Sequence, residues 1–114
     1  MTGRIVFLAE DDYFQAKELR RACEESGFEV IGPAGRLEEA LALVREAPRI
    51  DGAVLDINLH DVMIYPVADL LRERGVPFVF ATGYERTTLP ARFADVPHHE
   101  KPVGRETIMA ALFG

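Results

Sequence analysis

The chain has 114 residues, of which 48% are hydrophobic, and its formal net charge is −6. This length suits one domain, and we expect residues 1–114 to form a single domain with no output domain. The excess of acidic residues argues against a nucleic-acid partner bound over a broad surface. Long apolar runs are absent and Cys23 is a lone cysteine, so we expect a cytoplasmic protein with no membrane contact and Cys23 buried in its core.

Apolar runs typical of buried strands alternate with segments of helical periodicity along the chain. The strand-like runs cover residues 5–9, 29–32, 53–56, 78–81 and, more weakly, 98–100. The helical segments begin at residues 13, 37, 67 and 105. Because parallel neighbours need crossover connections, this alternation predicts an α/β fold with a five-stranded parallel sheet and helices on both faces.

The first helical segment has an apolar stripe and a cap signal. We expect Asp12 to cap it, with a buried stripe formed by Phe14, Leu19, Ala22 and Cys23. The two adjacent histidines of the last strand, His98 and His99, must point to opposite faces of the sheet. We therefore expect one ring to be packed and the other to be solvated, rather than a shared metal site.

Polar and charged residues follow four of the strand-like runs. They are the acidic run Glu10-Asp11-Asp12, then Asp56, Thr82 and Lys101. Any one of these residues alone would have an ordinary structural explanation: Asp caps helices, Thr occurs in turns, and Lys is usually solvated. Ligands of open parallel sheets bind outside the carboxyl ends of the strands. Because all four polar groups follow strand ends, we expect them to form a site at the carboxyl edge of the sheet.

Clustered carboxylates repel one another unless a cation is present, and hard oxygen ligands are those that Mg²⁺ or Mn²⁺ prefers. We expect Asp11 and Asp56 to be direct ligands, Glu10 to bind through water or to orient the other ligands, and the Asn58 main-chain carbonyl to complete the set. With the metal bound, the Asp56 carboxylate can attack a phosphoryl group. Lys101 and Thr82 would then stabilise the phosphoryl oxygens.

These residues resemble the motifs of receiver domains of bacterial two-component response regulators. The matching motifs are Glu10-Asp11, Asp56 followed by Asn58, Thr82, and Lys101-Pro102, and the resemblance covers nearly the whole chain. It implies a flavodoxin-like strand order of 2-1-3-4-5 and a cis peptide before Pro102. It also implies a phosphoryl-accepting signalling switch, with Asp56 as acceptor, rather than an enzyme.

A narrower resemblance rests on the run Phe80-Ala81-Thr82-Gly83-Tyr84, which is similar to FATGUY-type receivers. Many of these consist of a receiver alone, which implies a sensor histidine kinase or a histidine phosphotransfer protein as partner, with an unknown downstream protein. The implied switch and partner surface comprises Gly83, Tyr84, His98 and Pro102. His98 departs from the family, which often has an aromatic switch residue three positions before the lysine.

The segment between Thr82 and Lys101 is poor in helix signals because Pro90 and Pro97 interrupt it. We expect a fourth helix that is short or irregular, at most a turn over residues 90–94. Our hypothesis is that residues 83–97 are loose before phosphorylation, and that a hydrogen bond from Thr82 to the phosphoryl group orders them and presents Tyr84, Leu89 and Phe93 differently to a partner.

Two other functions compete with the switch. An aspartyl-phosphate phosphatase normally has a second Asp two residues after its nucleophile, and this chain has Asn58 there. A pseudo-receiver that acts as a binding module usually lacks the acceptor or the lysine, and this chain has both Asp56 and Lys101. The residues therefore favour the phosphoryl-accepting switch.

Overall fold

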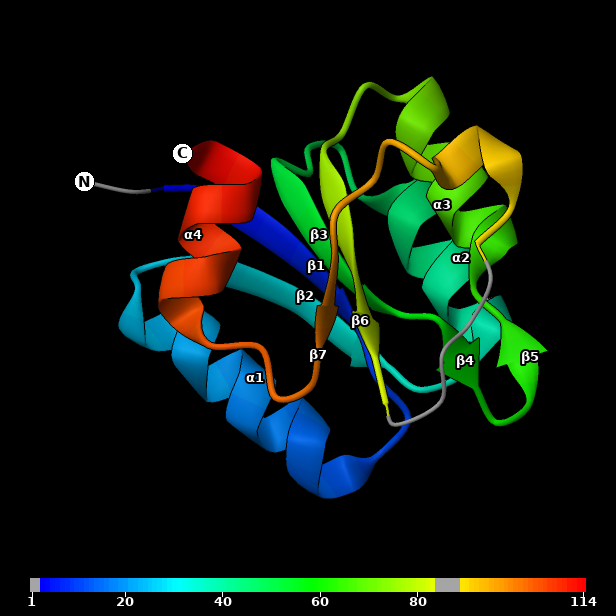
Figure 1. Ribbon diagram of the computed structural model, residues 1–114. Helices are drawn as coiled ribbons and strands as arrows, with labels where there is room; N and C mark the ends of the chain where they lie inside the picture. Colours follow the sequence, from blue (N-terminus) through cyan, green and yellow to red (C-terminus); the bar gives the residue numbers. More distant parts are fainter. Residues whose placement is uncertain (1–2, 84–88) are drawn as a thin grey trace.

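The computed structural model describes residues 3–83 and 89–114, and its centre is a five-stranded parallel sheet (Figure 1). The strand order is β2-β1-β3-β6-β7. The strands are β1 (Ile5–Ala9), β2 (Glu29–Ala34), β3 (Gly52–Asp56), β6 (Phe78–Thr82) and β7 (His98–Glu100). Counted along these five strands, this is the order 2-1-3-4-5, so the predicted α/β fold is confirmed.

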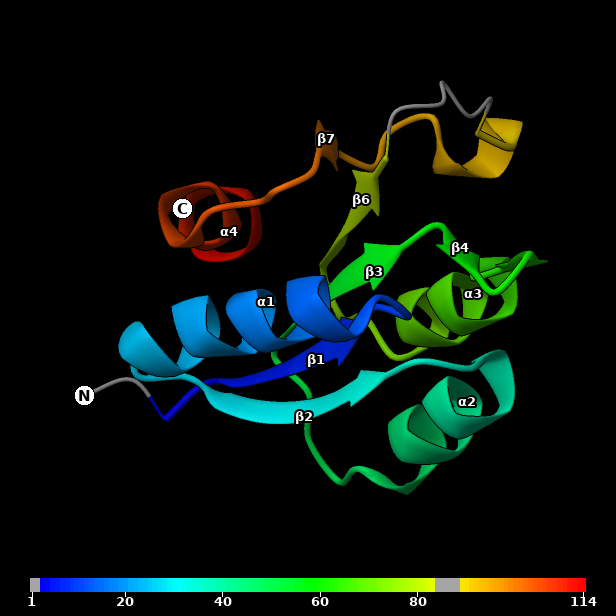
Figure 2. The ribbon, with the colours of Figure 1, turned by 90° about the horizontal axis from the view of Figure 1, so that it is seen from below.

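Four helices cover the two faces of the sheet. Figure 2 shows α1 and α4 on one face and α2 and α3 on the other. Their bounds are α1 (Tyr13–Glu25), α2 (Leu37–Glu46), α3 (Tyr65–Glu73) and α4 (Arg105–Phe113). Among these described helices none has the length and apolar character needed to cross a membrane.

Successive residues of the central strands enter two separate cores, as the pleat of a strand requires. Phe7 packs into the core under α2 and α3, whereas Val6 and Leu8 pack into the core under α1 and α4. Cys23 is fully buried in this second core, as expected. Burial of the thiol, together with the charge of Glu24, raises the pKa of Cys23 to about 11, so the thiol stays neutral.

Helix α1 begins as expected but buries a different stripe. The Asp12 carboxylate accepts a hydrogen bond from the Gln15 amide at 2.9 Å, which confirms the predicted cap. Phe14, however, is 70% exposed, so its expected burial is wrong. It precedes Leu19 by five residues, which turns it roughly 140° away from the buried stripe at about 3.6 residues per turn. Phe14 is therefore a surface aromatic near the carboxyl ends of the strands.

The predicted short fourth helix is a single 3₁₀ turn, η1 (Ala91–Phe93). Phe93 is fully buried against Tyr65, Phe78 and Phe80 in the unphosphorylated chain, and its presentation to a partner after phosphorylation stays a prediction. Leu89 packs against the same core. Tyr84 lies outside the described residues.

Ion pairs from α3 hold the segment around η1 in place. Arg72 donates hydrogen bonds to the Arg92 carbonyl oxygen and to the Asp95 carboxylate, and Arg92 donates two to Asp69. The guanidinium of Arg92 also lies 4.6 Å from the ring centre of Phe93. These contacts argue against a loose surface over residues 89–97.

Strand β2 approaches β1 closely where Gly32 lies. Gly32 has a φ of 98°, and a Cβ placed there would lie 2.6 Å from the Leu8 carbonyl oxygen and 2.8 Å from the Ala34 nitrogen. Both atoms belong to the backbone and cannot move aside easily. Any side chain at this position would push β2 away from its neighbour β1.

We therefore expect Gly32→Ala to lower the free energy of unfolding by at least about 2 kcal/mol, through backbone strain and overlap. Gly75→Ala is the matched control, because Gly75 also has a positive φ, 71°, but has open space around it. The control should lose about 1 kcal/mol, from strain alone. Denaturant unfolding measures both, and equal losses would contradict the close approach.

Candidate functional site

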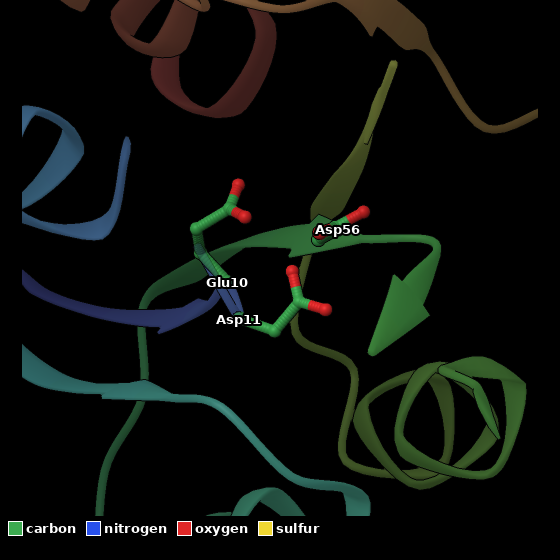
Figure 3. Close-up of side chains that lie close together, drawn as sticks. All are labelled: Glu10, Asp11 and Asp56. Carbon is green, nitrogen blue, oxygen red and sulfur yellow. The ribbon is translucent and has the colours of Figure 1, made fainter. Parts of the chain in front are cut away.

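Three carboxylates meet at the carboxyl ends of two neighbouring strands. Figure 3 shows Glu10 and Asp11, which directly follow β1, beside Asp56, the last residue of β3. Each residue offers a carboxylate oxygen, and these oxygens lie within 4.8 Å of one another. Glu10 and Asp56 are 4% and 5% exposed, so two acidic groups are removed from water in the same place.

Lys101 provides the positive charge that this cluster needs. Its Nζ lies 2.9 Å from Glu10 Oε1 and 2.9 Å from Asp56 Oδ2. Lys101 directly follows β7, and its amide donates a hydrogen bond to the Thr82 carbonyl oxygen at 2.8 Å. Burial alone would lower the pKa of Lys101, but the bonds and charges of Glu10 and Asp56 outweigh it and raise the pKa, so the side chain stays an ammonium.

Asp56 is the acidic group whose titration is most strongly displaced. Burial, opposed by the hydrogen bond from Lys101 and reinforced by the charge of Glu10, raises the pKa of Asp56 to about 7. Its Oδ1 also accepts a hydrogen bond from the Asn58 amide at 3.2 Å. Without a further cation, the folded protein therefore holds a proton on Asp56 more tightly than an unfolded chain does.

Glu10 and Asp11 are held by different groups. Glu10 Oε2 accepts a hydrogen bond from the Asp12 amide at 3.1 Å, while its other oxygen contacts Lys101. Asp11 Oδ2 accepts a hydrogen bond from the His60 amide at 2.8 Å. Burial would raise the pKa of Asp11, but this bond and the groups beside it lower the pKa overall, so Asp11 is ionised at neutral pH.

The donor set fits a hard divalent cation. All the clustered ligand atoms are carboxylate oxygens, and Asp11, at 23% side-chain exposure, leaves the cluster open to solvent. Mg²⁺ and Mn²⁺ prefer such oxygen ligands and usually retain several waters. Because both oxygens of Glu10 already have partners, its expected role in orienting the site agrees with this geometry.

The other predicted residues that the structure describes lie in β6 and β7 or directly after these strands. Thr82 ends β6, which pairs with β3 so that Ala81 lies beside Asp56, and Gly83 follows it on the surface. Pro102 follows Lys101 through a cis peptide bond, as expected. His98 is exposed and His99 is partly buried, so the expected division between the two rings is confirmed. Tyr84 belongs to the undescribed residues, and its part in the site stays a prediction.

Sequence reasoning missed a small hairpin formed by β4 (Asn58–Leu59) and β5 (Val62–Met63). Its two turn residues, His60 and Asp61, have φ values of 50° and 66° without being glycines. The Asn58 side-chain oxygen accepts a hydrogen bond from the Asp61 amide at 2.7 Å. Asn, Asp and His tolerate positive φ better than other residues, and the run from Asn58 to Asp61 was the available signal.

A cavity of about 330 Å³ adjoins the cluster between α1 and the loop that follows β7. Its walls include Phe14 and Leu19 of α1, Pro102 and Val103 of the loop, and the side chain of Lys101. Phe14 and its neighbour Tyr13 are exposed, at 70% and 83%. The mouth of the site is therefore bordered by apolar surface.

Folding raises the pKa of Asp56 above its unfolded value of about 3.9. Protonation of Asp56 therefore makes its full contribution to the free energy of unfolding below about pH 4. This contribution is lost as the pH rises to about 7. We expect Asp56→Asn to be more stable than the parent by about 1–3 kcal/mol at pH 8, and nearly equal to it at pH 4.

Thermal or denaturant unfolding in a chelating buffer at the two pH values measures this difference. Groups that titrate elsewhere cancel between the two proteins. A stability difference that does not change between pH 4 and pH 8 would contradict the raised pKa of Asp56.

Comparisons with known proteins support one family. SdrG from Sphingomonas melonis Fr1 is 34% identical, with a TM-score of 0.83, and the match covers 98% of this chain and 96% of SdrG. A signal receiver domain of a modulated diguanylate cyclase from Desulfovibrio desulfuricans G20 is 28% identical, with a TM-score of 0.79 and coverage of 96% and 90%. A response regulator receiver protein from Sinorhizobium medicae WSM419, 21% identical with a TM-score of 0.78 and coverage of 96% and 91%, shares the fold.

No family model matches the chain. The likeness to SdrG nevertheless extends over nearly the full length of both chains, and the similar structures are receiver proteins and receiver domains. The chain belongs to the response-regulator receiver family.

Proposed function

We propose that this receiver is a metal-assisted phosphoryl acceptor whose nucleophile is Asp56. The observation that carries the proposal is the position of Lys101, with its Nζ 2.9 Å from both Asp56 and Glu10. A partly buried ammonium beside a buried carboxylate is suited to meet the negative charge that arrives with a phosphoryl group. Membership of the receiver family supports the same function as a signalling regulator.

The cation would be held by oxygens of Asp11 and Asp56 and by the Asn58 main-chain carbonyl, and it would supply positive charge beside the phosphoryl oxygens. In the transfer step, an oxygen of Asp56 forms a bond to phosphorus as the bond from phosphorus to the donor breaks. The leaving atom of the donor keeps the electron pair. Lys101 then pairs with a phosphoryl oxygen, and Thr82, at the end of β6, donates a hydrogen bond to another.

The rival functions have less support from the residues of the site. A phosphatase needs a proton donor for its leaving group and a base for water, and the side chain two residues after Asp56 is the amide Asn58, which accepts from Asp61. A binding module that is never phosphorylated gives no reason to bury Asp56 beside Glu10, because their repulsion destabilises the fold.

The phosphodonor we propose is a protein, a histidine kinase or a histidine phosphotransfer protein. In that case the leaving atom is an imidazole nitrogen. Support comes from the apolar border of the site, where Tyr13 and Phe14 are exposed and Phe14 lines the adjoining cavity. Exposed aromatic side chains beside a reactive group are typical of protein interfaces.

We expect a small phosphodonor with Mg²⁺ to add one phosphoryl group to the protein, and alkali to remove it, because acyl phosphates are labile. Asp56→Asn should stay unmodified, and chelation of the metal should suppress labelling. Lys101→Ala should fold and bind metal but be labelled more weakly. Intact-mass and peptide mass spectrometry provide the readout, and a mark on Thr82, His98 or His99 would overturn the mechanism.

The apolar border should affect the rate of phosphoryl transfer from a protein donor but not from a small phosphodonor. We expect Phe14→Ala to slow transfer from a phosphorylated histidine kinase by about tenfold or more, which corresponds to about 1.4 kcal/mol, and to leave labelling by a small phosphodonor unchanged.

Met109→Ala is the matched control, since Met109 is an exposed apolar residue of α4 that does not line the cavity. A panel of kinases first identifies an active donor, and rates are then compared with that donor. Equal rates for the parent and Phe14→Ala would exclude Phe14 from the docking surface.

A further inference from the structure

The β4–β5 hairpin follows β3, the strand that ends in Asp56, and it contacts Asp11 in the loop after β1. It begins two residues after Asp56, and the amide of Ile64, just beyond it, donates to the Ile57 carbonyl oxygen at 2.8 Å. At its tip the Asp61 amide donates to the Asn58 side chain. The hairpin is therefore closed by hydrogen bonds at both its base and its turn.

From this turn the hairpin reaches Asp11, a residue 49 positions away in the sequence. The His60 amide donates a hydrogen bond of 2.8 Å to Asp11 Oδ2. Lys101 orients Glu10 and Asp56. Apart from Asp56 and the loop that contains Asp11 itself, the partner of the Asp11 carboxylate among the described residues is His60. The orientation of the third carboxylate therefore depends on the hairpin.

The turn keeps a backbone conformation that is unfavourable for its residues. His60 and Asp61 both lie in the left-handed region, with φ values of 50° and 66°. For residues other than glycine this costs about 1–2 kcal/mol each, less for Asp and His than for branched residues. The His60 amide makes its contact with Asp11 from within this turn, so a substitution that disfavours positive φ is expected to disturb the contact.

We propose that the hairpin is a positioning device for the metal ligand Asp11, and that it acts through the main-chain amide of His60. The hydrogen bond to Oδ2 would hold the Asp11 carboxylate beside Glu10 and Asp56, where it could bind a divalent cation. This inference rests on the metal-assisted function proposed above. Groups that orient a ligand in this way typically contribute 10- to 100-fold to metal affinity.

The imidazole ring of His60 has a smaller part than the amide. Its Nδ1 lies 3.8 Å from Asp11 Oδ2, which is too far for a hydrogen bond, and the side chain is 58% exposed. Interactions between such exposed charges contribute little in water. His60 is therefore a positioning residue through its backbone, and a variant that keeps the turn without the ring should keep the function.

Two substitutions at position 60 separate the backbone from the ring. His60→Gly removes the ring and adopts positive φ without strain, whereas His60→Val removes the ring and disfavours that conformation. We expect His60→Gly to bind Mn²⁺ within about threefold of the parent, and His60→Val to bind it about tenfold more weakly or worse. Electron paramagnetic resonance of free Mn²⁺, titrated with the full chain, measures the affinity.

Unfolding in a chelating buffer shows that each variant is folded, and His60→Ala, which also disfavours positive φ, replaces His60→Val if that variant does not fold. Met63→Val is the matched control, because it places the same side chain in the same hairpin away from the turn. The control should bind Mn²⁺ as the parent does.

The outcomes distinguish this inference from the function on which it rests. A parent protein that does not bind Mn²⁺ would overturn the metal-assisted function and the inference together. A parent that binds Mn²⁺ and is phosphorylated, combined with parent-like affinity in His60→Val, would overturn the inference alone. Equal losses in His60→Gly and His60→Val would assign the effect to the ring and also overturn it.

Discussion

The ammonium of Lys101 between two buried carboxylates is the interaction on which this site depends. Glu10 and Asp56 are almost completely removed from water, and two such charges at close range would oppose folding if they were alone. Lys101 lies 2.9 Å from each of them and offsets most of that repulsion. Burial, with the charge of Glu10 added to it, still raises the pKa of Asp56 to about 7, so the site is ready to accept a further positive charge.

The fold brings these groups together from three separate strands. Parallel pairing of β1, β3, β6 and β7 places all their carboxyl ends at one edge, so residues 45 positions apart in the sequence come into contact. The two cores below this edge fix the strands, and the ion pairs of Arg72 and Arg92 fix the chain around η1. The η1 segment ends before β7, whose last residue directly precedes Lys101.

The sequence allowed the fold and the reactive side chains to be predicted because both depend on strongly patterned signals. Apolar runs of strand length ending in Glu10, Asp56, Thr82 and Lys101 placed those residues at one edge. Phe14 was wrongly assigned to the buried stripe because it is an apolar residue in the first turn of α1. In the helix it lies on a different face from Leu19. The burial of Phe93 was not predicted because it depends on Tyr65 of α3, a contact between distant segments. The hairpin was missed because its turn contains His60 and Asp61 where a glycine would have signalled positive φ.

Two supports thus hold the cluster: Lys101 pairs with both Glu10 and Asp56, and the His60 amide donates to Asp11. We propose that Lys101 pairs with an oxygen of the phosphoryl group on Asp56 and no longer bridges Glu10 and Asp56. The most direct test is a crystal structure of the full chain with Mg²⁺ and beryllofluoride, a mimic of the phosphoryl group. We expect the mimic on an Asp56 oxygen, with Lys101 Nζ donating a hydrogen bond to one of its fluorines. A structure in which Asp56 does not hold the mimic, or in which Lys101 still bridges Glu10 and Asp56, would contradict this proposal.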